Sequence, residues 1–258
     1  MTIIELLTED RLSDAIAQQR AIVEANPSDS TARLTLFELQ VMGCQFLDAH
    51  AVLKQFETST PEFQTYASSL RKLLRAERRR QHGFKPDLLL EPPMHIRCRW
   101  HALKASRTQD VVKTAKWADR AESKTPSVRG HVNGREFTGL RDLDDRFSSF
   151  FEFLLNGRYY WIPFEQIRKL TLGNVEGYLD NVLRPAELYL KVDVMYRGHL
   201  PLVYPGTSLA KKDESFVLGR DTDFTEAAGL IVGIGDRVMH LGEEELSLSE
   251  IKQLEFRN

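Results

Sequence analysis

Three residues between positions 95 and 101 have side chains that bind metal ions in other proteins. His95, Cys98 and His101 follow one another at intervals of three. In a helix, His95 and Cys98 would lie one turn apart, whereas His101 would drift off that face. A structural zinc site needs four ligands, and no second cluster of cysteine and histidine completes the set. We therefore interpret these residues as structural and predict no metal site.

Glycines gather in a second stretch with the pattern Gly229-x-x-x-Gly233-x-Gly235. This stretch is apolar, lacks the Lys-Ser/Thr pair of a phosphate-binding loop, and has the wrong spacing for a dinucleotide fingerprint. A bend within a strand explains the glycines better. The Gly-x-Ser-x-Gly and His-Glu-x-x-His patterns of hydrolases do not occur in the sequence. We predict no catalytic residues and no cofactor.

Asp142, Asp144 and Asp145 form an acidic cluster that could hold a cation, but the residues between and after them do not follow an EF-hand pattern. Apolar residues spaced like one face of a helix occupy the same region and continue beyond it: Leu143, Phe147, Phe150, Phe151, Leu154 and Leu155. We therefore expect a helix here that ends at Gly157, with the aspartates at its positive N-terminal end.

Basic residues crowd the end of a predicted helix that runs from about Phe63 to Gly83. Glu77 is the single acid among them, and the cations are Arg71, Lys72, Arg75, Arg78, Arg79 and Arg80. Cations are favourable near a helix C-terminus, so a solvated helix end explains the run. An electrostatic patch for an acidic or nucleic-acid partner is the alternative. Nucleic acid is disfavoured because no aromatic residues interleave the run and the net charge is -2.

The composition is that of a globular protein with room for one large domain or two ordinary ones. Of 258 residues, 42% are hydrophobic and 28% are charged. The two cysteines, Cys44 and Cys98, are far apart and suggest a reducing compartment. We see no apolar run long enough to span a membrane and no signal-peptide pattern at the N-terminus. These features predict a cytoplasmic protein without membrane contact.

The elements that must position these groups begin with a repeat between Leu12 and Pro61. Asp14-Ala15 recurs as Asp48-Ala49, an offset of 34 residues, which is the period of the tetratricopeptide (TPR) helical hairpin. Matching positions at the same offset are Leu12 with Phe46, Ala17 with Ala51, and Pro27 with Pro61. We predict stacked TPR-like helical hairpins, in which the small alanines let neighbouring helices approach closely.

Prolines 86, 92 and 93 then predict an extended connector over residues 85–93. A third helical pair follows at about 94–106 and 108–124, which we interpret as a degenerate capping repeat. Its predicted inward face is Val111, Val112, Ala115 and Ala118. We assign residues 1–126 to a TPR-like helical domain.

From residue 127 the pattern alternates with the period of strands. Asn133-Gly134 predicts a hairpin turn, and further strands are expected over 159–163, 167–172, 187–194 and 230–234. The loop from Tyr204 to Asp213 has the composition of an exposed segment. Residues 166–172 resemble residues 250–256, each following a turn. We predict an α+β fold in which residues 127–258 form a mixed domain with a small, curved, partly closed antiparallel sheet.

Several motifs in this second half resemble the ImpE family, also called TagJ. They are Arg141-Asp142-x-Asp144-Asp145, Phe151-Glu152-x-Leu154, Gly157 to Ile167 (GRYYWIPFEQI), Leu183-Arg184-Pro185-Ala186, Leu202-x-Tyr204-Pro205-Gly206-Thr207 and Leu218-Gly219-Arg220-x-Thr222-Asp223. One departure is Leu179 to Leu183, where the family would place a tryptophan before Arg184-Pro185. The resemblance implies a non-enzymatic adaptor of the bacterial type VI secretion system. Its implied partners are an N-terminal helix of the small sheath subunit TssB and, indirectly, the ClpV ATPase.

Stacked hairpins leave an extended surface that accepts a peptide or helix, which agrees with an adaptor. We expect the outward faces of residues 31–42 and 62–80 to bind an amphipathic partner helix. The candidate partner-binding residues are Arg71, Arg75, Arg78, Arg79, Phe37 and Gln40. One alternative is a nucleic-acid-binding adaptor that uses residues 71–80. The other is a cryptic enzyme in the C-terminal domain, with Tyr159, Tyr160 and Trp161 as a pocket wall.

Overall fold

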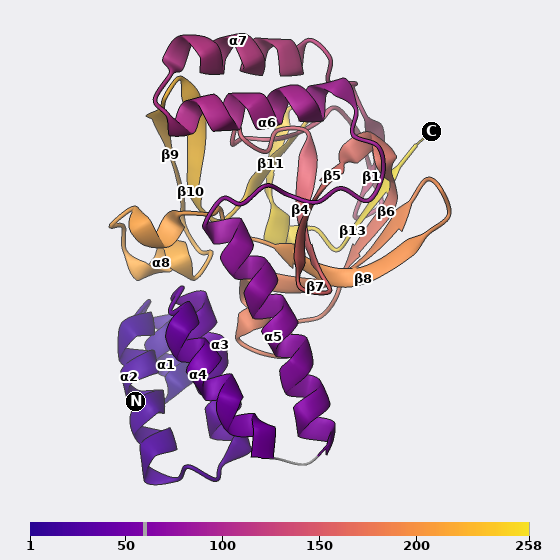
Figure 1. Cartoon of the computed structure of the whole chain (residues 1–258). Helices are drawn as coiled ribbons and strands as arrows, with labels where there is room; N and C mark the ends of the chain where they lie inside the picture. Colours follow the sequence, from indigo (N-terminus) through magenta and orange to yellow (C-terminus); the bar gives the residue numbers. More distant parts are fainter. Residues whose placement is uncertain (59–60, 258) are drawn as a thin grey trace.

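The structure is a computed structural model that describes residues 1–58 and 61–257, and it combines helices with antiparallel strands (Figure 1). The helices are α1 (Ile3–Thr8), α2 (Leu12–Ala25), α3 (Ser30–Met42), α4 (Phe46–Lys54), α5 (Pro61–Gln81), α6 (Met94–Arg107), α7 (Val111–Glu122) and α8 (Glu214–Val217). Short 3₁₀ turns are η1 (Gln55–Thr58), η2 (Phe164–Gln166), η3 (Leu179–Asn181), η4 (Thr207–Leu209) and η5 (Leu248–Glu250). The α+β class predicted from the sequence is confirmed.

The main sheet has eight strands in the order β2-β1-β13-β6-β7-β8-β4-β5. Their bounds are β1 (Arg129–Val132), β2 (Arg135–Thr138), β4 (Phe150–Leu155), β5 (Arg158–Pro163), β6 (Ile167–Leu172), β7 (Leu183–Leu190), β8 (Met195–Pro201) and β13 (Gln253–Phe256). Two smaller sheets contain β3 (Leu140–Asp142), β11 (Val238–Leu241) and β12 (Glu244–Ser247), and β9 (Thr222–Ala227) with β10 (Leu230–Gly235).

The expected partial closure of the main sheet is wrong. Among the described residues, β2 and β5 lie at opposite edges and do not pair with each other. The connector lies against the β5 edge, where the Asp87 nitrogen donates to the Tyr159 carbonyl at 2.8 Å and the Trp161 nitrogen donates to the Asp87 carbonyl at 3.2 Å. At the other edge, Asn133 and Gly134 both have positive φ, as a tight two-residue hairpin turn requires.

The helix expected after Asp142 is also wrong, because β4 occupies Phe150–Leu155. All six residues of β4 are buried, since the strand has packed side chains on both faces. Phe150 and Leu154 pack in the core that the sheet shares with the helices, whereas Phe151 and Phe153 pack in a core on the opposite face. A strand buried on both sides reads as a continuous apolar run, which matched a helical spacing by coincidence.

Helices α1 to α5 pack in order along the chain, and Ala15 and Ala49 are fully buried between them. The pair α6–α7 forms as expected but does not extend this array: it lies across the sheet, away from α1 to α4 (Figure 1). Its predicted inward face is wrong at Val111 and Val112, which are 51% and 82% exposed, whereas Ala115 and Ala118 are partly buried. Helix α7 instead buries Thr114 and Ala121, two small side chains that allow close packing.

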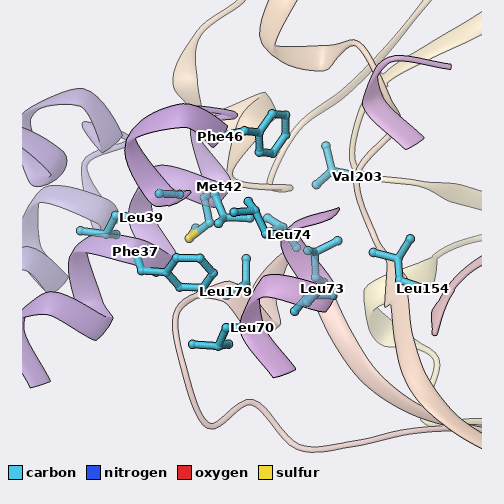
Figure 2. Packing of buried hydrophobic residues seen from close by; sticks show 14 of the residues in the cluster. Phe37, Leu39, Met42, Phe46, Leu70, Leu73, Leu74, Leu154, Leu179 and Val203 are labelled. Carbon is cyan, nitrogen blue, oxygen red and sulfur yellow. The ribbon is translucent and has the colours of Figure 1, made fainter. Parts of the chain in front are cut away.

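One hydrophobic core joins the helical array to the strand-rich half. Phe37, Leu39 and Met42 of α3 pack in the same cluster as Leu179 and Val203 (Figure 2). A hydrogen bond supports this arrangement, since the backbone nitrogen of Tyr178 donates to the side-chain carboxylate of Glu38 at 3.0 Å. The inner surface of the helical array is therefore filled by the chain's own residues.

Two other expectations need correction. Strand β7 ends at Leu190, and residues 191–194 form a turn rather than the rest of a strand. In the segment from Tyr204 to Asp213, Lys211 and Lys212 are exposed, but Tyr204 is fully buried. Its hydroxyl donates to Asp142 at 2.7 Å, so this segment enters the interior of the protein.

Candidate functional site: a buried ion-pair network below an open cavity

A buried cluster of charged residues connects α5 with the sheet. Arg80 of α5 donates to Glu77 one turn earlier at 2.7 Å and to Glu152 of β4 at 3.1 Å. Arg237 donates to the same Glu152 at 3.0 Å and to Asp142 at 2.6 Å. The side chains of all five residues are 5% exposed or less. We refer to these five residues as the ion-pair network.

Tyr159 and Tyr204 complete the hydrogen bonds of the network, Tyr159 to Glu152 and Tyr204 to Asp142. The Tyr159 hydroxyl donates to Glu152 and accepts a hydrogen bond from the Trp161 indole at 2.5 Å. Burial and the neighbouring Glu152 carboxylate raise the pKa of Tyr159, which keeps the hydroxyl protonated as a donor. Burial likewise raises the pKa of Asp142, while the field of Arg237 acts in the opposite direction. The carboxylates thus have buried partners that offset the cost of removing charge from water.

The three aspartates at 142, 144 and 145 do not cap a helix. Asp142 binds Arg237, Asp144 binds Arg146 at 2.6 Å, and Asp145 binds Arg141 at 2.6 Å. Asp144 also accepts from the backbone of Gly233 at 2.8 Å, so it connects the loop before β4 to β10. The glycine-rich stretch therefore supplies a backbone donor to the loop that carries the ion-paired aspartates. Gly233 has no space for a side chain because Tyr204 lies against it.

An open cavity of about 320 Å³ lies above the network. Its walls come from the end of α5, the end of α6, strands β4 and β5, and the β9–β10 hairpin. Tyr159 and Trp161 line it, as the enzyme alternative expected of a pocket wall, but Tyr160 does not. The ionisable residues Arg80 and Glu152 in its wall are bound to each other and to other buried groups.

The residues proposed for partner binding separate into two groups. Arg75 and Arg78 are exposed on α5, Arg79 is partly exposed with its guanidinium 5.4 Å from the centre of the Phe84 ring, and Arg71 is partly buried. In contrast, Phe37 is fully buried and Gln40 is 2% exposed. The expectation that these two residues face a partner is wrong for this conformation, because the inner surface of the array is filled. Arg80 belongs to the ion-pair network, which removes one cation from the nucleic-acid alternative.

His95, Cys98 and His101 do not come together as ligands, and no group of metal-binding side chains occurs among the described residues. His95 lies between Ser149, at 3.1 Å from Nδ1, and Glu165, at 2.6 Å from Nε2. This order resembles a Ser-His-Glu triad, but Ser149 and His95 are 2% and 1% exposed. Because a substrate cannot reach the serine, we assign the triplet to packing of α6 against the sheet.

Sequence reasoning missed Glu152 and Arg237 as members of one network, and Tyr204 as a hydrogen-bond donor to it. A signal was present, because Glu152 interrupts an otherwise apolar strand and charged residues are rarely buried without a partner. The identity of the partners was not accessible, since they lie 72 and 85 residues away along the chain.

No helix in the described ranges has the length and apolarity needed to cross a bilayer.

The second half of the chain corresponds to a known family of protein domains. Residues 134–255 match the model of the ImpE protein family, so the resemblance seen in the sequence motifs is confirmed.

More particularly, the chain is 28% identical over 260 residues to the type VI secretion system accessory component TagJ of Pseudomonas aeruginosa. That alignment covers 98% of this chain and 90% of the relative. The crystal structure of protein VPA1032 from Vibrio parahaemolyticus superposes with a TM-score of 0.90 at 25% identity, covering 99% of this chain and 97% of that one.

Proposed function

We propose that this chain is an accessory protein of a bacterial type VI secretion system that acts in the cytoplasm as a non-enzymatic adaptor. The observation that carries the proposal is the alignment with TagJ, which extends over both the helical array and the strand-rich half. The shared core supports a role as one rigid binding unit. We propose as its partner the N-terminal helix of a TssB-like sheath subunit, with an indirect link to the ClpV ATPase.

The outer face of α5 is the surface we propose for this partner. The inner surface of the array is filled, so a partner helix must bind outside it. Lys72, Arg75 and Arg78 recur every three residues, are exposed, and have no carboxylate partner among the described residues. This stripe would complement acidic residues on an amphipathic helix. Arg79, stacked on Phe84, and the partly buried Arg71 lie beside the stripe.

Binding of a purified TssB-like subunit, with and without its N-terminal helix, tests the proposal. We expect Arg75→Glu with Arg78→Glu to weaken binding about tenfold or more, because two attractive pairs become repulsive. The matched control is Arg135→Glu with Arg168→Glu, which reverses two exposed arginines on strands β2 and β6. Unchanged binding of the α5 variant would remove the stripe from the site. Absence of binding by the unaltered protein would overturn the choice of partner.

A further inference from the structure

The cavity above the ion-pair network has features of a ligand site that the adaptor role does not use. Its volume of about 320 Å³ falls at the lower end of small-molecule sites. Apolar side chains make most of its wall, with polar groups at one side, as in sites that hold an amphipathic ligand. The apolar residues that line it are Phe84, Leu103, Phe147, Trp161, Leu230 and Val232.

Two guanidinium groups face this cavity and differ in how they are paired. Arg146 donates to Asp144 through Nε and Nη2, which leaves Nη1 without a partner among the described atoms. Arg107 has no carboxylate partner in the described part of the chain and lies 5.4 Å from the centre of the Trp100 ring. Burial lowers the pKa of Arg107; Tyr159 acts against this shift, and the positive field of Arg146 adds to it. Arg107 is therefore the guanidinium at the cavity that has no ion-pair partner among the described residues.

The backbone holds Arg107 at the rim. Gly83 follows α5 with φ of +63°, and a Cβ at this position would lie 2.6 Å from Nη2 of Arg107. The absence of a side chain thus lets the guanidinium lie directly over the turn after α5. Arg107 is itself the last residue of α6, so both helix ends contribute to its position.

We propose that this cavity binds an organic carboxylate with an apolar body. The carboxylate lies between Arg107 and Arg146, where it pairs with the Arg107 guanidinium and accepts charge-assisted hydrogen bonds. The apolar body packs against Trp161, Phe147 and Leu230. A free organic acid and the C-terminal carboxylate of a peptide share this chemistry, and they differ in size and in what surrounds the carboxylate.

Calorimetric titration of the full-length protein with 3-phenylpropionate tests the proposal. The neutral 3-phenylpropionamide has the same shape without the charge. We expect the acid to bind about tenfold or more tightly than the amide, because charge-assisted hydrogen bonds are the stronger ones. A short peptide that ends in phenylalanine, as free acid and as amide, forms the second arm. Tighter binding of the peptide acid would assign the site to a protein C-terminus, and tighter binding of the small acid to a free ligand.

Arg107→Met removes the charge and keeps the length of the side chain, and we expect it to weaken acid binding about tenfold or more. The matched control is Arg120→Met, since Arg120 stacks on Trp117 at 5.5 Å in the neighbouring helix α7, outside the cavity. A second variant, Ala227→Trp, fills the cavity from an exposed position and is expected to abolish binding. Equal affinity of the Arg107 and Arg120 variants, or absence of binding by both acids, would overturn the proposal.

Discussion

Arg80 of helix α5 and Glu152 of strand β4 form a fully buried ion pair at 3.1 Å. They are separated by 72 residues, and their pairing joins the helical array to the sheet. Burial acts to lower the pKa of Arg80, but the fields of Glu77 and Glu152 outweigh it and raise the pKa. The guanidinium therefore stays charged in the interior, and each carboxylate depends on it.

Replacement of Arg237 by methionine should be strongly destabilising. The change leaves Asp142 and Glu152 buried with one cation fewer between them. We expect the free energy of unfolding to fall by about 3–5 kcal/mol, as for other buried pairs that lose one member. Denaturant titration measures it, with Arg257→Met as control. Arg257 forms an exposed pair with Glu136, and its loss should cost about 1 kcal/mol or less. Equal losses in the two variants would contradict the prediction.

Arg80→Met should loosen α5 from the sheet. The variant removes the bonds from Arg80 to Glu152 and to the Val203 carbonyl, and both acceptors lie outside α5. We expect faster amide hydrogen exchange in α5 and β4, because local opening costs less when these contacts are absent. Arg78→Met, two residues earlier and exposed, is the control and should leave exchange unchanged. Protection that stays equal in both variants would show that the apolar core alone holds α5.

The carboxyl group of Asp236 should make stability depend on pH. Burial raises its pKa from the ordinary value of 3.8 to about 6. Between those pH values the folded state holds a proton that the unfolded state has released, so stability falls as pH rises from about 4 to 6. Asp236→Asn should remove this loss and gain about 3 kcal/mol above pH 6.

Thermal unfolding at pH 4 and pH 7 measures the effect, and Asp48→Asn provides a control at an exposed carboxylate. If the wild-type protein gained stability relative to the Asp236→Asn variant between pH 4 and pH 6, the assignment of the pH dependence to Asp236 would be contradicted.

Gly130 should tolerate alanine less well than Gly134, although both glycines belong to the β1–β2 hairpin region. A Cβ at Gly130 would lie 1.8 Å from the Glu255 carbonyl oxygen, which belongs to the backbone of β13 and cannot move aside easily. Gly134 has open space but φ of +83°, so alanine there costs about 1 kcal/mol of backbone strain. Denaturation midpoints of the two variants should rank Gly130→Ala as the less stable. The reverse order would mean that β1 and β13 separate readily.

Local patterns predicted local structure well. The Asn133-Gly134 turn and the strand over Tyr159 to Pro163 were identified from adjacent residues, because their signals lie within a few positions. The helix expected after Asp142 failed because a strand buried on both faces has no alternation to reveal it.

Contacts across the chain were beyond sequence reasoning. Phe37 and Gln40 were expected to face a partner, yet residues such as Leu179 and Val203, from the second half of the chain, share the core of the helical array. Nothing within α3 indicates whether its apolar face meets another protein or its own chain. The division into domains at residues 126 and 127 stays a prediction. The ion-pair network was likewise unpredictable, since its members come from four separated segments.

The bridge between Asp87 and Tyr160 lies at one edge of the main sheet and bears on aggregation with other proteins. An uncovered edge strand offers its backbone amides to any extended segment it meets, and crowded assemblies supply many such segments. Here the chain's own connector pairs with the middle of that edge through Asp87. The opposite edge strand, β2, is only four residues long and carries Arg135 and Glu136. Both edges of the main sheet are therefore poor templates for pairing with a strand of another molecule, which disfavours fibre-like assembly through this sheet.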